Sequence, residues 1–466
     1  MKDITVKDIV NICQGKLICG DENIICKEFK KDTRTIKTGD VYVGIKGENF
    51  DGNTLYEEAF ENGAEVCIVS GVEAKEYEGK TIIEVEDSLN ALQKIAEYKR
   101  SLYNIPVIAV TGSVGKTSTK DIIASVMSQK YKVLKTEGNM NNHIGLPMTI
   151  LKLEDHEAMV VEMGMDHAGE ISVLTNIAHP TMCVISNIGS SHIGTLGSRE
   201  NILKAKLEIL EGTSEDSPIA INNDNDLLNN WIKTNNTTHK IITYGIETKS
   251  DVMARDIESF EDKSTFTLEL NNKIWDQVAL CHKVEVPVGG KHFVYNALSA
   301  ICVGLENNIE IQKIIEGIKK LELTKRRMEI IKCKNGVTII NDTYNANYES
   351  MKAGLEYLHS VNGNRKIAIL GDMLNLGDYE TELHEKIGEE VVKSEVSVLI
   401  TVGKASQNIA KRALELGSVT NIKTHECKTN EEAIKFAKEE LKQGDIVLVK
   451  ASNAMHFDEI VEKIQM

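Results

Sequence analysis

A strand, a glycine turn and a helix follow one another between residues 107 and 127, and this order constrains the fold more than any other stretch. Residues 107–110 form an apolar run, and Thr111-Gly-Ser-Val-Gly-Lys-Thr117 follows it directly. Apolar side chains then recur at helical spacing from Ile122 to Met127. Such an arrangement points backbone N–H groups and the positive end of a helix dipole at one place. The stretch therefore predicts a phosphate cradle.

The turn also carries the side chains that bind a nucleotide phosphate and its metal ion. Lys116 adds a positive charge, and the Thr117 hydroxyl can reach a Mg²⁺ ion. The general pattern has one more glycine where this chain has Val110, so the loop is the shorter T-G-x-x-G-K-T form. We assign the cradle to Gly112, Ser113, Val114, Gly115, Lys116, Thr117 and Ser118.

Two further apolar runs end in polar residues of the kind found at strand tips. Residues 158–161 lead into Glu162, and residues 182–189 lead into a Ser-Ser-His sequence that ends at His192. In a doubly wound sheet the carboxyl ends of the strands line one crevice. We therefore expect Lys116, Glu162 and His192 to converge, with Glu162 beside Mg²⁺, because this ion favours oxygen ligands.

Composition excludes several other classes of protein. The chain has 54 Lys and Arg against 70 Asp and Glu, a net charge of −16 that argues against nucleic acid as the main partner. No apolar run approaches the roughly 18 residues needed to cross a bilayer. The start of the chain lacks a signal-peptide core. Nine cysteines without a C-x-x-C pair favour reduced thiols, so we expect a cytoplasmic protein with no membrane insertion.

A chain of 466 residues is long enough for two to four domains, and we expect three α/β domains over residues 1–99, 100–320 and 321–466. Residues 251–286 are rich in strand formers and predict antiparallel β-structure inside the second domain. The third domain alternates strands and helices, which predicts a parallel sheet with right-handed crossovers. It has no complete phosphate loop, so we expect it to complete a site in the second domain.

Three segments are ambiguous by pattern. The Asn- and Gly-rich residues 135–147 are either a turn cluster or a polar lip over a ligand. Residues 32–34 and 46–53 are loops, and on pattern alone we interpret them as solvated turns. The helix predicted over residues 198–211 has the spacing of an ordinary amphipathic helix, which would place Lys206 on a lysine-rich outer face.

Taken together, these motifs resemble the Mur ligase family of ATP-dependent enzymes that form amide bonds in peptidoglycan precursors. The resemblance spans nearly the whole chain. Residues 138–147, 167–171, 344–347 and 370–377 are similar to the branch of the family that adds D-Ala-D-Ala. The family-wide motifs are the phosphate loop, Glu162-Met-Gly, Asn187-Ile-Gly with His192, Lys206 within Ala-Lys-Leu-Glu, His292 with Asn296, Arg327 and Asp342.

The resemblance implies both an architecture and a reaction. It implies a small UDP-binding α/β domain, a central P-loop ATPase domain with a parallel sheet, and a C-terminal Rossmann-like α/β domain. The implied reaction joins D-Ala-D-Ala to UDP-MurNAc-tripeptide through an acyl phosphate, at the expense of ATP. This step belongs to cytoplasmic peptidoglycan precursor synthesis, and hence to cell wall formation, cell shape and division. We further expect a monomer whose site is split among three domains that close over the substrates.

The resemblance also assigns roles to single residues. Lys116 would hold the β- and γ-phosphates, Thr117 and Glu162 a first Mg²⁺, and His192 a second Mg²⁺ together with Lys206. Lys206 would be carbamylated by CO₂, contrary to the exposed position that the helix pattern indicates. These four, Lys116, Glu162, His192 and Lys206, are the expected catalytic residues. For ATP, the implied contacts are His292 and Asn296 with adenine, Arg327 with the phosphates and Asp342 with the ribose.

The substrate contacts that the resemblance implies fall into two groups, and a few positions depart from the family pattern. Asn53 stands where a histidine is common, Asp166 where Asn is expected, Tyr348 where Pro is frequent, and Asn453 where Arg is usual. The UDP pocket would contain Asp32, Arg34, Lys46, Asp51, Gly52 and Asn53, and the remaining substrate residues would be Asn141, Asn142, Tyr344, Asn345 and Asn347.

Two alternatives compete with this prediction. One is a related ligase that uses another dipeptide or acceptor. The other is a nucleotide-binding regulator without catalysis, against which the intact Glu162, His192 and Lys206 argue. Within the main prediction, the third residue of the tripeptide is either diaminopimelate or lysine.

Overall fold

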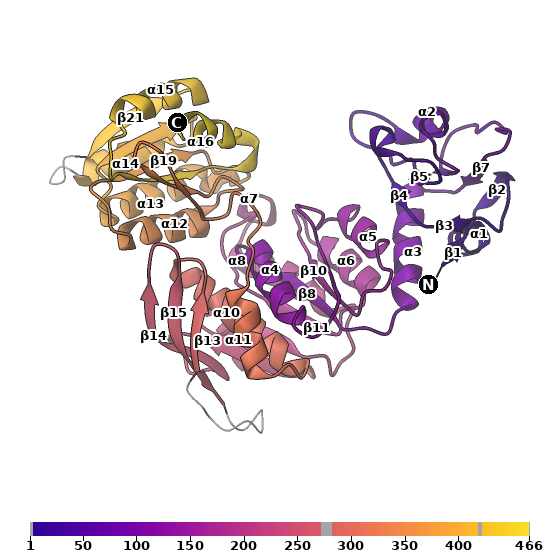
Figure 1. Cartoon of the computed structure of the whole chain (residues 1–466), viewed down its shortest axis with the longest axis horizontal. Helices are drawn as coiled ribbons and strands as arrows, with labels where there is room; N and C mark the ends of the chain where they lie inside the picture. Colours follow the sequence, from indigo (N-terminus) through magenta and orange to yellow (C-terminus); the bar gives the residue numbers. More distant parts are fainter. Residues whose placement is uncertain (1–2, 272–281, 418–421, 466) are drawn as a thin grey trace.

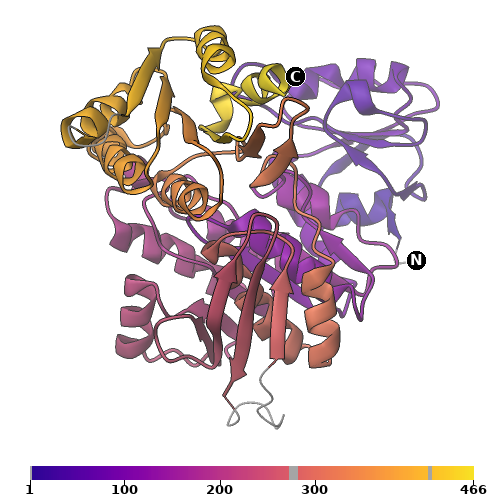
Figure 2. The same cartoon turned by 60° about the vertical axis from the view of Figure 1, so that its left-hand side comes forward.

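The computed structural model describes residues 3–271, 282–417 and 422–465. The chain forms three α/β units in sequence order. The N-terminal and C-terminal units lie at opposite ends of the long axis with the central unit between them (Figure 1). Both outer units lie above the central unit in this view, and they do so in the view turned by 60° as well (Figure 2).

The N-terminal unit is a mixed sheet with a short ribbon beside it. Its core strand β6 is buried along its whole length. The strands are β1 Ile4–Thr5, β2 Lys16–Cys19, β3 Ile25–Cys26, β4 Phe29–Lys30, β5 Val41–Val43, β6 Val66–Val69 and β7 Thr81–Glu84. The helices are α1 Val6–Cys13, α2 Tyr56–Glu61 and α3 Ser88–Ser101, with 3₁₀ turns η1 Thr33–Thr35 and η2 Gly52–Leu55.

The strand order in this sheet is β2-β7-β6-β5-β4, parallel except for the pairing of β2 with β7. The parallel strands β4 and β5 therefore end at the same edge. Both loops that the resemblance assigned to a UDP pocket, residues 32–34 and 46–53, follow these two strands. The ribbon of β1 and β3 is antiparallel.

Helix α3 joins the first two units. Arg100 in its last turn is 7% exposed, and its guanidinium donates to the carbonyls of Ala178 (2.8 Å), Tyr103 (2.5 Å) and His179 (3.2 Å). Ala178 and His179 close a helix of the central unit, so the cation also meets the negative end of that helix dipole. Burial lowers the pKa of Arg100 from its ordinary value.

Replacing Arg100 by methionine should lower the free energy of unfolding by about 1–3 kcal/mol, because it leaves buried carbonyl acceptors without donors. Urea denaturation followed by circular dichroism measures the change. The matched control is Arg255→Met, since Arg255 pairs with Glu269 where both side chains are about half exposed. There the change should stay within roughly 0.5 kcal/mol. Equal effects of the two substitutions would contradict this account of Arg100.

The central unit is a single extended sheet flanked by helices. Its strands are β8 Val107–Thr111, β9 Val133–Lys135, β10 Ala158–Glu162, β11 Met182–Ile185, β12 Ile219–Asn222, β13 Ile241–Gly245, β14 Val252–Ser259, β15 Ser264–Leu270 and β16 His282–Val286. Its helices are α4 Lys116–Met127, α5 Gly145–Ile150, α6 Glu170–Ala178, α7 Ile193–Leu196, α8 Arg199–Leu207, α9 Asp226–Thr234, α10 Lys291–Glu306 and α11 Ile311–Lys319, with a 3₁₀ turn η3 Glu208–Leu210.

The strand order is β16-β15-β14-β13-β12-β11-β8-β10-β9. All pairings from β9 to β14 are parallel, and β14, β15 and β16 pair antiparallel. Strands β8, β10, β11 and β12 are buried along their whole length, as both faces of a parallel sheet must be. The order brings the tips of β10, β8 and β11 side by side. The antiparallel structure predicted for residues 251–286 is confirmed where it is described, and residues 272–281 lie outside the described residues.

The C-terminal unit is a sheet covered on both faces. Alternate residues of its strand β19 face two separate apolar clusters, Ile367 and Ile369 on one side and Ala368 and Leu370 on the other. The strands are β17 Glu329–Lys332, β18 Thr338–Asn341, β19 Lys366–Gly371, β20 Val398–Val402, β21 Lys423–Cys427 and β22 Ile446–Lys450. The helices are α12 Tyr348–Ser360, α13 Glu380–Lys393, α14 Gln407–Leu416, α15 Asn430–Glu440 and α16 Asp458–Ile464, with 3₁₀ turns η4 Gly377–Tyr379 and η6 Asn453–Met455.

The order is β17-β18-β22-β19-β20-β21, parallel except for the β17–β18 pair. The predicted α/β class with a central parallel sheet and a Rossmann-like last unit is confirmed. Over the described parts of the chain, none of the helices is long and apolar enough to span a bilayer. The cysteines in those parts are free thiols.

Candidate active site

The phosphate loop takes the predicted place between β8 and α4, and two of its glycines are required by the backbone. Gly112 has φ +154°, and a Cβ there would lie 1.9 Å from the Ser186 hydroxyl oxygen. Gly115 has φ +77° and forms the N-cap of α4. The first four N–H groups of a helix have no partner within it. The loop therefore presents free donors and the positive end of α4 at the tip of β8.

The residues that follow β11 form hydrogen bonds with the backbone of this loop. Ser113 N donates to the Asn187 carbonyl (3.1 Å), and Val114 N donates to Asn187 Oδ1 (3.0 Å). The Ser191 hydroxyl donates to the Ser113 carbonyl (2.9 Å). Lys116 Nζ folds back onto the Gly112 carbonyl at 2.8 Å. Desolvation lowers the pKa of Lys116, while Glu162 raises it.

Thr117 and Glu162 meet at the centre of the site. The Thr117 hydroxyl donates to Glu162 Oε2 (2.9 Å), and Asn141 Nδ2 donates to Glu162 Oε1 (2.8 Å). Both Thr117 and Glu162 are buried, at 2% exposure each. A hydroxyl and a carboxylate beside a phosphate cradle are a donor set that fits Mg²⁺, which prefers oxygen ligands.

No group of three or more His, Cys, Asp or Glu side chains is placed to hold a metal ion in the described part of the chain. A Mg²⁺ ion at Thr117 and Glu162 would therefore share its coordination with phosphate and water oxygens, as this ion commonly does. The site residues fit an ion that arrives with a nucleotide.

His192 lies beside the same cradle, at the N-cap of α7, with a left-handed backbone of φ 65°. Its Nδ1 is 2.9 Å from Asp166 Oδ1. Burial lowers the pKa of His192 to about 4, and the nearby Lys116 and Lys206 contribute. At neutral pH the ring is therefore uncharged, which is the form that binds metal ions.

Lys206 is buried at 1% exposure, so the expectation of an exposed position from the helix pattern is wrong. On its helix α8, Lys206 is buried together with Ile202 and Ala205. Burial lowers the pKa of Lys206 well below its ordinary value, and the nearby charge of Lys116 lowers this pKa further. The Glu162 carboxylate acts in the other direction and raises it. Among the described residues, no hydrogen bond or ion pair engages its amine.

Helix α10 brings the predicted adenine residues to the other side of the loop. The Thr119 hydroxyl donates to Asn296 Oδ1 (3.1 Å), across 177 positions of sequence. Asn296 Nδ2 is buried without a hydrogen-bond partner in the part of the chain described. Such an orphaned donor suits a base with acceptor nitrogens. The His292 ring stacks at a tilt against Phe293, with centroids 4.4 Å apart, and desolvation lowers its pKa to about 4.

The C-terminal unit contributes Arg327 directly to the metal-type donor pair. Arg327 Nη2 donates to the Thr117 hydroxyl (2.8 Å), and its guanidinium lies over the Tyr344 ring, 3.9 Å from the centroid. Arg327 Nε is buried without a partner among the residues described. Arg327 therefore brings a positive charge next to the Thr117–Glu162 pair.

Asp342 follows β18 and is held by a buried lysine. Lys450 Nζ donates to Asp342 Oδ2 (2.5 Å) and to the Asn345 carbonyl (2.8 Å). Desolvation lowers the pKa of Lys450, and Asp342 raises it. Both residues stand at tips of adjacent parallel strands, which is the same signal that identified Glu162. Lys450 was missed from sequence, although this signal could have found it.

One cavity of about 650 Å³ brings most predicted site residues together. Glu349, which sequence reasoning also missed, lines it as well, and its carboxylate accepts from Ser190 N (2.7 Å) and Oγ (3.0 Å). A first-turn helix residue carries no sequence signal for such a role. The predicted residues that line the cavity are Ser113, Val114, Gly115, Lys116, Thr117, Ser118, Asn141, Asn142, Glu162, His192, His292, Asn296, Arg327, Asp342, Tyr344, Asn345 and Asn347.

Gly112 and Lys206 are not among the residues that line this cavity. The N-terminal residues Asp32, Arg34, Lys46, Asp51, Gly52 and Asn53 do not line it. Arg34 pairs with Asp32 at 2.6 Å on the surface, and Asn53 is buried at 1% exposure, where Asp51 and Ser70 bind its side chain. Their role in a UDP pocket stays a prediction.

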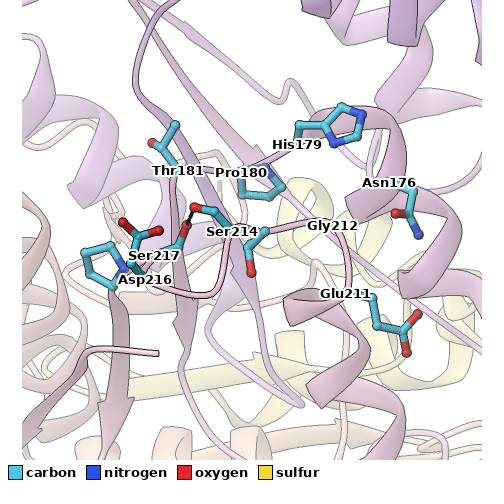
Figure 3. A pocket seen from close by; sticks show the side chains of 11 residues that line it. Asn176, His179, Pro180, Thr181, Glu211, Gly212, Ser214, Asp216 and Ser217 are labelled. Carbon is cyan, nitrogen blue, oxygen red and sulfur yellow. Dashed lines mark hydrogen bonds between the residues drawn. The ribbon is translucent and has the colours of Figure 1, made fainter. Parts of the chain in front are cut away.

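A second hollow lies at the amino ends of β11 and β12, away from the phosphate loop (Figure 3). Its titratable lining consists of His179, Glu211 and Asp216, and Ser214 and Ser217 bond to each other at 2.8 Å. The acidic side chains and the satisfied hydroxyls offer nothing to a phosphate. Neither lysine nor arginine is among the residues that line this hollow.

Comparison with known proteins decides which family has this arrangement. Three family models match: the Mur ligase family catalytic domain over residues 30–100, the Mur ligase middle domain over 110–304, and the Mur ligase glutamate ligase domain over 326–453. The chain belongs to the Mur ligase family. The three matches fall one each within the N-terminal, central and C-terminal units of this Mur ligase.

Individual relatives match this Mur ligase over nearly its whole length. It is 37% identical to the UDP-N-acetylmuramoyl-tripeptide–D-alanyl-D-alanine ligase of Bacillus subtilis, over 99% of this chain and 98% of that protein. A MurF structure from Acinetobacter baumannii superposes with a TM-score of 0.89 at 28% identity, over 100% and 99% of the two chains. MurF from Thermotoga maritima in complex with ADP superposes with a TM-score of 0.81 at 28% identity, over 94% and 97%.

Proposed function

We propose that this Mur ligase joins D-Ala-D-Ala to UDP-MurNAc-tripeptide with ATP, as a cytoplasmic step of peptidoglycan precursor synthesis. The observation that carries the proposal is the meeting of Arg327 from the C-terminal unit with the Thr117–Glu162 pair of the central unit. Such a junction can hold a triphosphate between two units. The name of the B. subtilis relative, which matches end to end, supports these substrates, and the ADP complex of the T. maritima relative supports ATP.

The proposed reaction activates a carboxylate that would not otherwise react with an amine. The terminal carboxylate oxygen of the tripeptide attacks the γ-phosphorus of ATP, and ADP leaves. The amine of D-Ala-D-Ala then attacks the acyl phosphate carbon, the C–O bond to phosphate breaks, and one proton is released. An amide, ADP and inorganic phosphate are formed. Because the first step brings two anions together, the site must neutralise negative charge.

The side chains around the cradle supply that neutralisation. Lys116 swings from the Gly112 carbonyl to the β- and γ-phosphates, and the N–H groups at the start of α4 bind the same oxygens. Arg327 binds the phosphates from the C-terminal side. Asn296 offers its free Nδ2 to adenine beside His292, and Asp342, held by Lys450, accepts from the ribose.

We assign two Mg²⁺ positions, one at Thr117 with Glu162 and one at His192 with Lys206. Bound there, the ions would screen the phosphate charge and polarise the γ-phosphorus for attack. Lys206 contributes as its carbamate: burial lowers the pKa of this amine well below its ordinary value, which favours the neutral form that reacts with CO₂, and the amine has no partner among the described residues. The product is an anion where an ammonium would repel the ions.

The N-terminal unit would bind the UDP end of the nucleotide substrate through Asp32, Arg34, Lys46, Asp51, Gly52 and Asn53. These loops share the edge where β4 and β5 end. Asn141, Asn142, Tyr344, Asn345 and Asn347 would contact the peptide and the incoming dipeptide around the cavity. We infer that the N-terminal unit moves toward the cavity during turnover, and that the enzyme works as a monomer.

A phosphate-release assay with a substrate panel tests the proposal. Release should require ATP, Mg²⁺, UDP-MurNAc-tripeptide and D-Ala-D-Ala together, because the acyl phosphate is consumed only when an amine attacks it. D-Ala-D-lactate and D-Ala-D-Ser in place of D-Ala-D-Ala measure the selectivity for the second residue. Full release with an unrelated acceptor would favour a paralogous ligase. Release that ignores the peptide substrate would favour the regulator alternative.

A further inference from the structure

A buried carboxylate of the phosphate-loop helix binds the chain segment that leads out of the central unit. Asp121 lies on α4, and its side chain is fully buried. Its Oδ1 pairs with the Nζ atoms of Lys120 (2.9 Å) and Lys135 (3.0 Å). Its Oδ2 accepts from the backbone N–H (3.2 Å) and the hydroxyl (2.8 Å) of Thr324. One oxygen therefore faces two cations, and the other makes a contact across 203 positions of sequence.

Thr324 belongs to the linker between the central and C-terminal units, residues 320–328, which follows α11 and precedes β17 (Figure 1). Three residues further along this linker, Arg327 donates to the Thr117 hydroxyl at 2.8 Å. Thr117 and Asp121 are four residues apart on α4, so their side chains share one face of the helix. The linker is thus attached to α4 at two neighbouring points, first at Asp121 and then at Thr117.

The backbone on both sides of Arg327 has a conformation that depends on such attachments. Arg326 and Met328 have left-handed φ angles of 64° and 48°, which residues other than glycine rarely adopt. Backbone of this kind persists where its surroundings hold it. On the C-terminal side, Asp342 Oδ1 accepts from Met328 N (3.3 Å). On the N-terminal side, the attachment is the contact of Thr324 with α4.

The bond to the linker is separable from the charge balance of the buried carboxylate. Lys120 also donates to the Thr136 carbonyl (2.8 Å). Burial raises the pKa of the Asp121 carboxyl, but the two ammonium groups lower it by more, so this pKa lies below its ordinary value. A charged acceptor binds a hydroxyl more strongly than a neutral acceptor does. Loss of the Thr324 hydroxyl therefore removes a strong contact and leaves the pairing of Asp121 with its lysines in place.

We propose that Asp121 is a positioning residue, which anchors the linker at Thr324 and so places the Arg327 guanidinium beside the nucleotide phosphates. This deepens the proposed function and rests on it for the identity of the nucleotide. A guanidinium that is aligned before the ligand arrives loses less freedom on binding, so the anchor raises the affinity for the triphosphate. The anchor also couples α4 to the C-terminal unit, because the linker leads directly into β17.

Thr324→Val tests the anchor, because it removes the hydroxyl and keeps a side chain of similar shape. Isothermal titration calorimetry measures the affinity for a β,γ-methylene analogue of ATP in the presence of Mg²⁺. This affinity should fall by about 10-fold, the effect of one hydrogen bond to a charged group. Thr324→Ser keeps the hydroxyl and should restore the wild-type affinity. An unchanged affinity in Thr324→Val would overturn the proposal, and circular dichroism verifies that each variant is folded.

A double-mutant cycle separates a positioning role from a general loss of stability. Arg327→Ala alone should weaken binding of the same analogue. Thr324→Val added to Arg327→Ala should cause no further loss, because the anchor acts through the guanidinium. Losses that add up in the double variant would overturn the proposal.

Thr243 provides a matched control in the central unit. Its N–H (2.9 Å) and hydroxyl (2.7 Å) both donate to Asp251 Oδ2, as those of Thr324 do to Asp121, and Thr243 is not among the residues that line the cavity. Thr243→Val should keep the wild-type affinity for the analogue. An equal loss of affinity in this variant would overturn the assignment to the linker.

The same measurements distinguish a failure of this proposal from a failure of the proposed function. If the wild-type chain binds the analogue but releases no phosphate with the full substrate set, the proposed function fails. The affinities of the Thr324 and Arg327 variants then still decide the role of Asp121. A wild-type chain that does not bind the analogue would overturn both.

Discussion

Replacing Lys116 by alanine is expected to lower the rate of phosphate release by about 10³-fold with the full substrate set. The γ-phosphoryl group and the substrate carboxylate are both anions, and Lys116 is the lysine of the phosphate cradle. Among the described residues, its amine donates only to the Gly112 carbonyl, at 2.8 Å, so it can move to phosphate without breaking an ion pair. Steady-state kinetics with saturating ATP and both other substrates measure the effect.

A lysine of the same unit that lies outside the cradle provides the control for this change. Lys132 is about half exposed and pairs with Asp155 on the surface. Lys132→Ala should keep the wild-type rate. A Lys116→Ala enzyme with near-normal release of ADP and phosphate would show that the phosphate loop is not where ATP reacts, and the whole site assignment would then be wrong.

Replacing Lys206 by methionine should lower turnover by at least about 10²-fold, because the carbamate that would hold the second metal ion cannot form. Methionine fills a similar volume, so the buried site at 1% exposure stays packed. Protein equilibrated with ¹³C-bicarbonate should show a carbamate carbon signal that is absent from Lys206→Met. Removal of CO₂ should lower wild-type activity, and added bicarbonate should restore it.

The same helix offers a matched control. Lys204 is exposed on α8, two positions before Lys206. Lys204→Met should keep both the carbamate signal and the rate. Loss of the signal in Lys204→Met, or full activity of Lys206→Met in CO₂-free buffer, would remove Lys206 from the catalytic set.

Sequence patterns predicted the helices, strands and turns whose conformation depends on residues close to one another in the chain. The strand, turn and helix around Gly112 and Gly115 follow from an apolar run, from backbone conformations that favour glycine, and from helical periodicity. The polar tips after β10 and β11 were also predictable, because parallel strands with short loops end at a shared edge.

Patterns failed where burial depends on what packs against an element. Lys206 occupies a helix position that the periodicity makes exposed, yet the central unit covers it. Its place in the site came from family resemblance and not from the residues around it. Glu349 carries no local signal, and Lys450 carried one that was overlooked at the tip of β22.

The sequence by itself determined the phosphate cradle, the parallel α/β units and the candidate residues at strand tips, because backbone sterics and apolar periodicity act within a few residues. Only the tertiary structure decided which distant side chains share the cavity: Arg327 on Thr117, Asn296 on Thr119 and Asp166 on His192. The first contact depends on how the C-terminal unit packs against the central unit, and the other two depend on how distant elements of the central unit pack against each other. No spacing along the chain encodes that packing.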